Sequence, residues 1–248
     1  MKCDKLIILF LFLFISIYWY GCSSSEKTTR EKGETVTEEK KPVLTPNEET
    51  ERELIDKQNI KSVDKISFDY QDGKLVNGEK QSTLNYGPNG LMTETIIYGK
   101  NSKVDNIYKY DYNKKNYRIQ TIRYTPDNKA DKKYTYDYNK YGNKIKSVRY
   151  DLNGNLEKYY IYKYDDNQKL TEEDWYDKST ELEYRIEYEY NENDIKKSAT
   201  TYNENGKMLY KYEYKYDQKG NVLEENKFNG DDDPVGVIQY VYKYYGTQ

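Results

Sequence analysis

Most of the chain beyond residue 80 alternates between a tyrosine or aliphatic residue and a charged or polar residue. Tyr134, Tyr136 and Tyr138 stand at every second position, separated by a threonine and an aspartate. A period of two is typical of strands that have one face buried and the other in water. The three-to-four-residue period of a helix does not occur in this region. The pattern therefore predicts a domain built of β-strands over residues 61–248.

The strands belong to an internal repeat of 26 residues. A first series of tyrosines recurs with this spacing at Tyr86, Tyr112, Tyr138, Tyr164, Tyr190, Tyr216 and Tyr242. A second series follows each member by 12 residues and consists of Tyr98, Tyr124, Tyr150, Tyr176, Tyr202 and Phe228. Twelve tyrosines and one phenylalanine in thirteen such positions are not a chance result. A fixed period of this length indicates a repeat architecture.

A turn sequence follows each member of both series. Gly90, Gly142 and Gly220 lie four residues after first-series tyrosines, and Asn or Asp begins most of the loops. Glycine adopts left-handed backbone without strain, and Asn and Asp side chains accept hydrogen bonds from nearby backbone amides, so both favour hairpin loops. The strands are therefore predicted to be antiparallel.

The apolar positions of one repeat have even offsets from the first-series tyrosine. In the repeat that begins at Tyr138 they are Val148, Tyr150, Leu156, Tyr160, Tyr162 and Tyr164. If each loop has five residues, even offsets fall on the same face on both sides of every turn. Odd positions such as Lys163 and Glu187 are largely charged. We therefore expect both tyrosine series on one face and an array of acids and bases on the other.

The number of strands decides the overall shape. Six repeats give twelve strands, and residues 63–70 and 74–85 predict one further hairpin. Twisted open sheets of more than about 10 strands tend to curl, split or close. Because one face must hide its aromatic side chains, we expect the sheet to curl around them, as an open spiral, a large barrel or a two-layer folded sheet.

Two segments of the chain resemble the YD (RHS-type) repeat, whose pattern is roughly G…YxYDxxGxL. They are residues 162–165 and residues 214–222, with Asn205 and Gly206 upstream. The resemblance covers about residues 83–245 and implies a coiled antiparallel sheet built of hairpins. The chain departs from the family in its even spacing, in Asn after three first-series tyrosines, and in lacking Gly at 116, 168 and 194. No segment resembles the protease-like core or toxin tip of large family members. MORN-type hairpin repeats are a weaker match.

Residues 1–21 predict a secretory signal. Two lysines precede an apolar run, and the 16 residues from Leu6 to Gly21 are fewer than the about 20 that a bilayer-spanning helix needs. The junction of Gly21 and Cys22 resembles the lipobox of bacterial lipoproteins, in the looser form of spirochaetes, because Trp19 and Tyr20 replace the usual leucine and small residue. The resemblance implies lipidation of Cys22. The alternative is an ordinary signal peptide or an uncleaved anchor.

Residues 22–60 predict a lipidated, flexible tether. Residues 23–41 are rich in Glu, Lys, Thr and Ser and bury too little apolar surface to offset the entropy of ordering. Pro46 followed by Glu48 and Glu49 is typical of a helix start, because proline fits the first helical position and acids favour the first turn. A short helix is therefore predicted over residues 46–57.

Composition excludes several function classes. The chain has no histidine and two cysteines, of which Cys3 leaves with the signal and Cys22 takes the lipid. Ser-His-Asp and Cys-His catalysis are therefore excluded, as are the usual His- or Cys-ligated metal sites. The net charge of −3 argues against binding to nucleic acid, which needs excess positive charge. We expect no cofactor.

Tyrosine accounts for 32 of the 248 residues and phenylalanine for only 5, and this excess has two interpretations. The first is structural, in which stacked cross-strand rings replace a missing aliphatic core. The second is functional, because buried hydroxyls need partners and so many of them suggest a partly hydrated groove that binds protein or glycan. The candidate ligand-contacting aromatic face is Tyr110, Tyr136, Tyr162, Tyr188, Tyr214 and Tyr240.

Acidic residues offer weaker candidates. Residues 231–233 and 165–167 could present oxygens to Ca²⁺, but they lack the spacing of an EF-hand loop, so solvated turns are the favoured interpretation. A carboxylate pair for glycan hydrolysis is conceivable among 43 acids, but none is marked by an apolar setting.

Together these features predict a lipid-anchored protein of the cell envelope, at the outer membrane or cell surface rather than the inner membrane. Its β-domain is expected to serve as a structural or adhesive module that binds protein or glycan, without enzymatic activity. Two alternatives stay open. One is a carboxylate-dependent enzyme that acts on envelope glycans, and the other is an immune-exposed coat protein without a small ligand.

Overall fold

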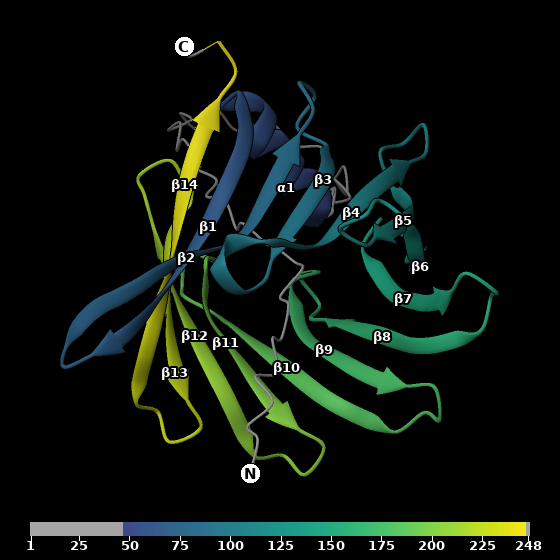
Figure 1. Ribbon diagram of the computed structural model, residues 1–248. Helices are drawn as coiled ribbons and strands as arrows, with labels where there is room; N and C mark the ends of the chain where they lie inside the picture. The colour runs from purple at the N-terminus through teal and green to yellow at the C-terminus, as the bar shows by residue number, and fades with distance from the viewer. Residues whose placement is uncertain (1–46, 247–248) are drawn as a thin grey trace, which may run out of the picture.

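The computed structural model describes residues 47–246, which form one short helix and a closed β-barrel (Figure 1). The helix is α1 (Asn47–Lys57). The strands are β1 (Ile60–Gln71), β2 (Lys74–Tyr86), β3 (Met92–Tyr98), β4 (Val104–Tyr112), β5 (Arg118–Tyr124), β6 (Ala130–Tyr138), β7 (Lys144–Asp151), β8 (Leu156–Tyr164), β9 (Leu170–Asp177), β10 (Leu182–Tyr190), β11 (Lys196–Asn203), β12 (Met208–Tyr216), β13 (Val222–Asn229) and β14 (Pro234–Tyr244). A single turn of 3-10 helix (Lys100–Ser102) joins β3 to β4.

Each strand pairs with its neighbours in the chain, and β1 pairs with β14 to close the ring. The prediction of an all-β antiparallel sheet of hairpins is therefore confirmed, as is the extra hairpin of β1 and β2. Of the shapes left open by the sequence, the large barrel is the one that forms. The open spiral and the two-layer sheet are wrong, because β1 and β14 satisfy each other's backbone groups instead of leaving two edges exposed.

The hairpin loops share one geometry. In the loop after Tyr138, the amide of Asn139 donates to the carbonyl of Asn143 at 2.8 Å, and Gly142 has φ +83°. The side chain of Asn139 accepts hydrogen bonds from the amides of Tyr141 and Asn143. Where the fourth loop residue is not glycine, it still has positive φ, as at Gln168. Asx at the first position and left-handed backbone at the fourth therefore define these turns.

Every repeat loop carries a β-bulge that changes which side chains face inward. After the turn at residues 139–143, Asp137 pairs with Lys146 but Tyr138 pairs with Lys144, so Ile145 is an extra residue. An extra residue reverses the inward and outward positions of the strand that follows. A second bulge at Tyr150 restores them.

The expectation that both tyrosine series share a face is therefore wrong. The first series points into the barrel, whereas the second series lies on the outer wall. Tyr176 stacks there on Tyr159 with ring centroids 4.8 Å apart, and lysine ammonium groups cover Tyr124 and Phe228. Val148 and Tyr150, at even offsets between the two bulges, also face outward because their cross-strand partners do.

Six of the seven first-series residues use the tyrosine hydroxyl to hold a neighbouring hairpin, and Tyr86 is the exception. The hydroxyl donates to the backbone carbonyl of the residue 20 positions earlier, as Tyr164 does to Lys144 at 2.6 Å. The other pairs are Tyr112 with Met92, Tyr138 with Arg118, Tyr190 with Leu170, Tyr216 with Lys196 and Tyr242 with Val222. We call this contact the tyrosine latch. It satisfies the carbonyl at the start of each strand that follows a first-series loop.

Helix α1 lies across the end of the barrel formed by the first-series loops, which we call the α1 end (Figure 1). Its Leu54 and Ile55 are buried against Val222, Ile238 and neighbouring side chains of the inner wall. Gly90 approaches the helix so closely that a Cβ atom there would lie 2.2 Å from the carbonyl oxygen of Arg52. The helix predicted over residues 46–57 is confirmed, but it packs on the barrel and belongs to the folded unit rather than to a tether.

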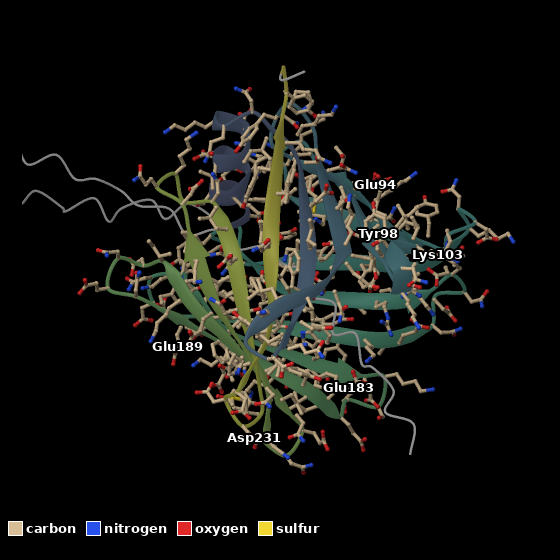
Figure 2. The ribbon with its side chains drawn as sticks, turned by 60° about the vertical axis from the view of Figure 1, so that its left-hand side comes forward. Glu94, Tyr98, Lys103, Glu183, Glu189 and Asp231 are labelled. Atoms are coloured by element: carbon tan, nitrogen blue, oxygen red, sulfur yellow. The ribbon has the colours of Figure 1, made fainter. Side chains whose placement is uncertain are left out.

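The outer wall is a lattice of ion pairs between strands. Asp174 on β9 accepts from Lys163 on β8 at 2.8 Å and from Arg185 on β10 at 2.9 Å. At the closing seam, Asp64 on β1 bonds Lys243 of β14 and Lys80 and Thr83 of β2. Figure 2 shows charged side chains such as Glu94 and Glu189 spread over this surface.

The predicted signal (residues 1–21), the lipidation site Cys22 and residues 23–46 of the predicted tether lie outside the described residues. Within residues 47–246, no helix has both the length and the apolar character needed to cross a bilayer.

Candidate binding surface on the inner wall

The six candidate tyrosines come together as a belt around the inside of the barrel. Tyr110, Tyr162, Tyr188 and Tyr240 are buried, and Tyr136 and Tyr214 are half-buried. Each stands two residues before a first-series tyrosine, on the second strand of its hairpin, so the repeat places all six at one level of the wall. We call this set the tyrosine belt. Whether it contacts a ligand stays a prediction.

Cations lie between neighbouring rings of the belt. The guanidinium of Arg118 is 4.4 Å from the ring centroid of Tyr110 and 5.9 Å from that of Tyr136. Lys144 Nζ lies 5.6 Å from Tyr136 and 4.6 Å from Tyr162. Such contacts stabilise buried cations through the negative face of the ring.

Lys196 occupies the same position two repeats later. Its Nζ lies 5.4 Å from the ring of Tyr188 and 4.4 Å from that of Tyr214. Arg118, Lys144 and Lys196 all stand six residues after a first-series tyrosine, where the other repeats have Met92, Leu170 and Val222. Around the ring the cations therefore lie on β5, β7 and β11, and the apolar side chains lie on β3, β9 and β13.

The belt hydroxyls pair with the side chain 15 residues earlier. Tyr110 donates to Thr95 at 2.8 Å, and Tyr162 and Ser147 share a hydrogen bond of 3.0 Å. Tyr136 pairs in this way with Thr121, Tyr188 with Glu173 and Tyr240 with Glu225. The idea that so many hydroxyls require a hydrated groove is therefore wrong for these five, because the protein supplies their partners.

One repeat breaks the hydroxyl pattern. The residue 15 positions before Tyr214 is Ala199, whose side chain has no hydrogen-bonding group, so Tyr214 cannot make the pair that the other five belt hydroxyls make. The nearby Thr201 hydroxyl is buried and lacks a partner within the described chain. The hydroxyls of this section of β11 and β12 are therefore candidates for hydrogen bonds to a ligand.

Two buried carboxyl groups stand out on the inside. Glu173 is 1% exposed, and burial raises its pKa to about 7 although Trp175 Nε1 donates to it at 2.7 Å. Burial likewise raises the pKa of Glu51, on α1, to about 8. No sequence pattern marks either residue, because only the fold places these acids among aromatic rings. Its burial keeps Glu173 from direct contact with a bulky substrate, whereas the Glu51 residue is half-buried.

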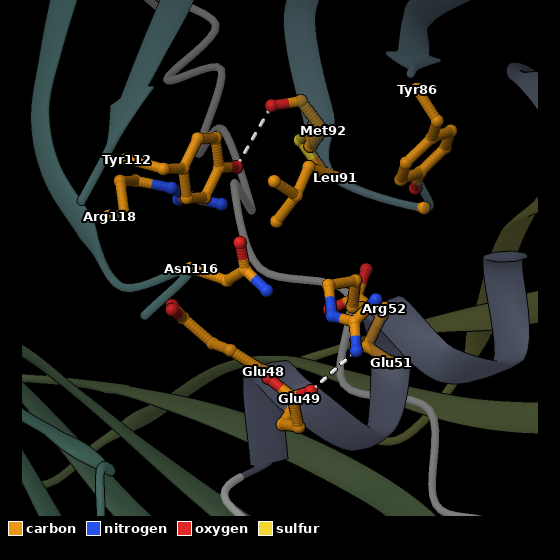
Figure 3. A pocket seen from close by; sticks show the side chains of 11 residues that line it. Glu48, Glu49, Glu51, Arg52, Tyr86, Leu91, Met92, Tyr112, Asn116 and Arg118 are labelled. Carbon is orange, nitrogen blue, oxygen red and sulfur yellow. Dashed lines mark hydrogen bonds and ion pairs between the residues drawn. The ribbon is translucent and has the colours of Figure 1, made fainter. Parts of the chain in front are cut away.

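Most of the charged side chains beneath α1 form ion pairs, and Arg118 is the exception. Glu48 Oε1 accepts from Lys144 at 3.2 Å, and Glu49 pairs with Arg52 at 2.5 Å. Nearby attraction from Lys144 and Arg118 outweighs the burial of Glu48 and keeps its pKa below the ordinary value. Arg118 itself has no ion-pair partner within 4.0 Å among the described residues. A small cavity lies between α1, Tyr86, Tyr112 and Arg118 (Figure 3).

The opposite end of the barrel, formed by the second-series loops, we call the far end. Inward-facing rings there keep partial exposure, namely those of Tyr134, Trp175, Tyr184 and Tyr210. At the α1 end, by contrast, the inward-facing Leu170 and Val222 are 1% exposed and Lys144 is 2% exposed. The latch tyrosines at the α1 end are half-buried as well, so fully buried side chains and half-buried rings occur together beneath the helix.

Rings and charges alternate at the far end. Trp175 meets Tyr160 and Tyr184 edge to face, with centroids 5.2 Å and 6.1 Å away. Lys227 Nζ lies 4.2 Å from the ring of Tyr210, and burial lowers its pKa. Ion pairs edge the wall, among them Arg123 with Asp131, Lys132 with Glu157 and Lys158 with Glu183.

The acidic turns do not gather into a metal site. Within the part of the chain that the structure describes, no three acidic residues converge as metal ligands. Asp165 accepts the amide of Lys169, and Asn229 accepts the amides of Asp231 and Asp233. These side chains serve their own turns.

No family model and no curated protein matches the chain. Among solved structures, a porin-like protein from Bacteroides uniformis is similar with a TM-score of 0.44 and 11% identity, over 74% of this chain and 98% of its own. A porin-like protein from Bacteroides vulgatus has a TM-score of 0.36 and 12% identity, over 76% and 99%. A Photorhabdus luminescens Tc holotoxin pore structure has a TM-score of 0.25 and 13% identity, over 71% and 10%. Similarity at this level assigns no family, and the YD-repeat resemblance stays a prediction.

Proposed function

We propose that this protein is a cell-envelope binding module that receives a glycan at the far end of its barrel. The observation that carries the proposal is the group of half-buried rings that face inward at the far end. Tyr134, Trp175 and Tyr210 belong to this group, whereas helix α1 covers the opposite end. Rings that line a concave surface and keep contact with water are suited to ligand binding, because they bury area without losing much entropy.

The chemistry of the far end favours a sugar chain over a folded protein. Sugar rings have apolar faces that pack on aromatic rings and hydroxyls that exchange hydrogen bonds with charged groups. Both kinds of partner alternate here, as at Tyr210 with Lys227. The rings stand on the inside of a closed wall, which admits an extended chain more readily than a globular surface. The hydroxyl of Tyr214, which faces Ala199 instead of a hydrogen-bonding side chain, provides a further contact deeper inside.

The outer wall supports a barrel that stands in water rather than in lipid. Asp174 with its two cationic partners lies near the middle of β9, where a bilayer would surround it. Arginine and lysine side chains on the lipid face of a membrane barrel cost about 2–4 kcal/mol each at the midplane. In this proposal the membrane partner is reached through lipid on Cys22. Mass spectrometry of the mature amino terminus tests whether Cys22 carries the lipid.

Trp175 gives a direct test of the ligand site. If the signal is removed, Trp19 leaves with it, and Trp175 becomes the only tryptophan of the mature chain. We expect fragments of envelope glycan to shift Trp175 emission and to protect it from acrylamide quenching. Replacing Tyr210 with alanine at the far end is expected to weaken binding about tenfold, since a stacked ring contributes about 1–3 kcal/mol by analogy with base stacking.

The control variant is Tyr176→Ala, which removes a ring of the outer wall and should leave binding unchanged. Equal losses from the two variants, or emission that no glycan alters, would refute the proposal. Release of shortened glycan during the titration would favour the enzyme alternative.

A further inference from the structure

One inward-facing cation of the far end forms no ion pair within the described residues. Lys227 lies on β13, level with the inward-facing Tyr212 of β12, and is half-buried. Its Nζ lies 4.2 Å from the ring centroid of Tyr210 and 6.0 Å from that of Tyr212. Within residues 47–246, no carboxylate oxygen lies within 4.0 Å of this nitrogen. The rings attract the ammonium group, but they carry no opposite charge.

The repeat shows which partner this position has elsewhere. Arg123 and Arg149 stand 11 residues after a first-series tyrosine, as Lys227 does. Arg123 Nε donates to Asp131 at 2.9 Å, and Arg149 Nε lies 3.0 Å from an oxygen of Glu157. Both acids stand eight residues after their arginine, at the bulge of the next strand. In two repeats, therefore, a carboxylate from the bulge neutralises the cation at this position.

The repeat of Lys227 lacks this acid. The residue eight positions after Lys227 is Val235, the extra residue of the bulge on β14, just as Asp131 is the extra residue on β6. An aliphatic side chain accepts no hydrogen bond and carries no charge. Asp69 on β1 attracts Lys227, but Asp69 is exposed and its carboxylate lies more than 4.0 Å away. The fold thus keeps the cation and omits its close counter-ion.

The position of Lys227 connects it to the proposed glycan site. Its ammonium group lies beside the ring of Tyr210, one of the half-buried rings of the far end. A negative group on a sugar that packs against this ring would therefore lie within reach of the ammonium group. Hydrogen bonds between an ammonium and a carboxylate are shorter and stronger than those with a neutral hydroxyl. They also offset the cost of removing the cation from water.

We propose that the ligand is an acidic glycan, and that the carboxylate of a uronic acid residue pairs with Lys227 while its sugar ring packs on Tyr210. This inference rests on the proposed glycan function and names the class of sugar that the site selects. A carboxylate is the expected group because Asp131 and Glu157 present one at the equivalent point of earlier repeats. A neutral sugar would leave Lys227 without a close negative charge.

Isothermal titration calorimetry of the full mature chain tests the inference. The probes are short oligogalacturonate and oligomannuronate chains, each compared with the same chains after full methyl esterification, which removes the charge and keeps the sugar rings. We expect the acidic form of at least one of them to bind about tenfold more tightly than its ester, because only the acid forms a charge-assisted hydrogen bond. Lys227→Met removes the charge and keeps an unbranched side chain, so it should abolish this difference.

A second variant restores the missing acid. Val235→Glu places a carboxylate at the position that Asp131 occupies in its repeat, so we expect it to pair with Lys227 and to abolish the preference for the acidic form. Val235→Gln has nearly the same shape without the charge and should keep the preference. This pair of variants tests the site even if Lys227→Met fails to fold.

The matched control is Lys211→Met, which removes an ammonium group from the outer wall, where it lies 5.4 Å from the ring of Phe228. It should keep the full preference. If envelope glycan fragments shift Trp175 emission but neither acidic probe binds better than its ester, glycan binding stands and the selection of acids is overturned. If no glycan binds at all, the proposed function fails as well. An unchanged preference in Lys227→Met would show that another cation recognises the acid.

Discussion

At the scale of single residues, the repeat places different amino acids at structurally equivalent positions, so their effects on the same backbone conformation can be compared. The fourth residue of each repeat loop has left-handed backbone, yet it is glycine in some repeats and Gln168, Thr180 or Asp194 in others. The branched side chain of Thr180 is poorly suited to its φ of +72°. Gly206 holds the same position one repeat later, with open space where a Cβ would stand.

This reciprocal pair predicts opposite changes in stability. Thr180→Gly should raise the free energy of unfolding by about 1 kcal/mol, and Gly206→Thr should lower it by a similar amount, because only the backbone conformation differs in cost. Urea denaturation of both variants measures the two shifts. Changes of the same sign would show that loop contacts, rather than backbone strain, decide the outcome.

The pair that Tyr214 cannot make with Ala199 leads to a second prediction. Ala199→Ser recreates the pair that Ser147 makes with Tyr162, and we expect a gain in unfolding free energy of about 1 kcal/mol from the new hydrogen bond. Ala130→Ser, at a half-buried position that pairs with the outward-facing Tyr124, is the control. If Ala199→Ser destabilises the protein, the site is too tight for the extra oxygen and the repeat analogy fails there.

At the scale of elements, helix α1 and the strands below it form a shared electrostatic unit. Glu51 on the helix and Glu173 on β9 both have raised pKa values, about 8 and about 7. The folded state therefore holds these protons more tightly than the unfolded chain, in which both groups titrate near 4.5. Their contribution to stability is complete below pH 4.5 and is lost as the pH rises through the folded-state pKa values.

We accordingly expect both groups to lower the free energy of unfolding as the pH rises from about 4.5 to about 7. Between about pH 7 and 8, only Glu51 continues to lower it. Each group contributes a slope of about 1.4 kcal/mol per pH unit inside its window. Urea denaturation at pH 5, 6, 7 and 8 should show a shallower slope for Glu51→Gln than for wild type. Glu192→Gln, in an exposed loop, should not change the slope. Identical profiles for wild type and Glu51→Gln would contradict the assignment.

The elements also show how far sequence reasoning reaches. Strands, loops and the short helix follow from local signals, namely a period of two, Asx-rich turns and a proline-led acidic segment. The facing of Val148 and Tyr150 does not follow from counting, because one bulged residue per turn reverses it. Asn139 and Gly142 at the first and fourth loop positions are the signals that identify such a bulge.

The candidate site was predictable only in part, for a related reason. The six belt tyrosines could be found because they repeat. Arg118, Lys144 and Lys196 were missed because they share their repeat position with apolar residues, so no pattern marks them. Glu51 and Arg118 come from segments far apart in the chain, and only the docking of α1 brings them to one cavity.

At the scale of the whole molecule, closure depends on a seam outside the repeats. Asp64 on β1 is 5% exposed and bonds groups of β2 and β14 together, while Lys65 beside it reaches Glu225 inside the barrel at 3.2 Å. The hydrogen bonds and ion pairs that Asp64 accepts hold its pKa below the ordinary value despite burial. The seam is thus held on both faces of the wall.

Asp64→Asn should lower the free energy of unfolding by about 2–3 kcal/mol, because it leaves Lys80 and Lys243 without their shared acceptor. Opening of the seam would expose the edges of β1 and β14, so we also expect self-association in light scattering after size-exclusion chromatography. Asp127→Asn, in an exposed pair with Lys129, should cost less than about 1 kcal/mol. Similar costs for the two variants would show that the seam does not need Asp64.

Two bulges in each 26-residue unit have a consequence for how such a wall can grow or shrink. Each bulge exchanges the inward-facing and outward-facing positions of the strand that follows it. Two bulges therefore restore the original positions, and a complete 26-residue unit can be gained or lost without changing which side chains of the other units face inward. Excision of residues 165–190 would join Tyr164 to Asn191 and leave a narrower barrel of twelve strands. An insertion of one residue within a strand would instead turn the aromatic rings of that strand toward the outer surface. The circumference of this fold is therefore adjustable only in whole hairpins.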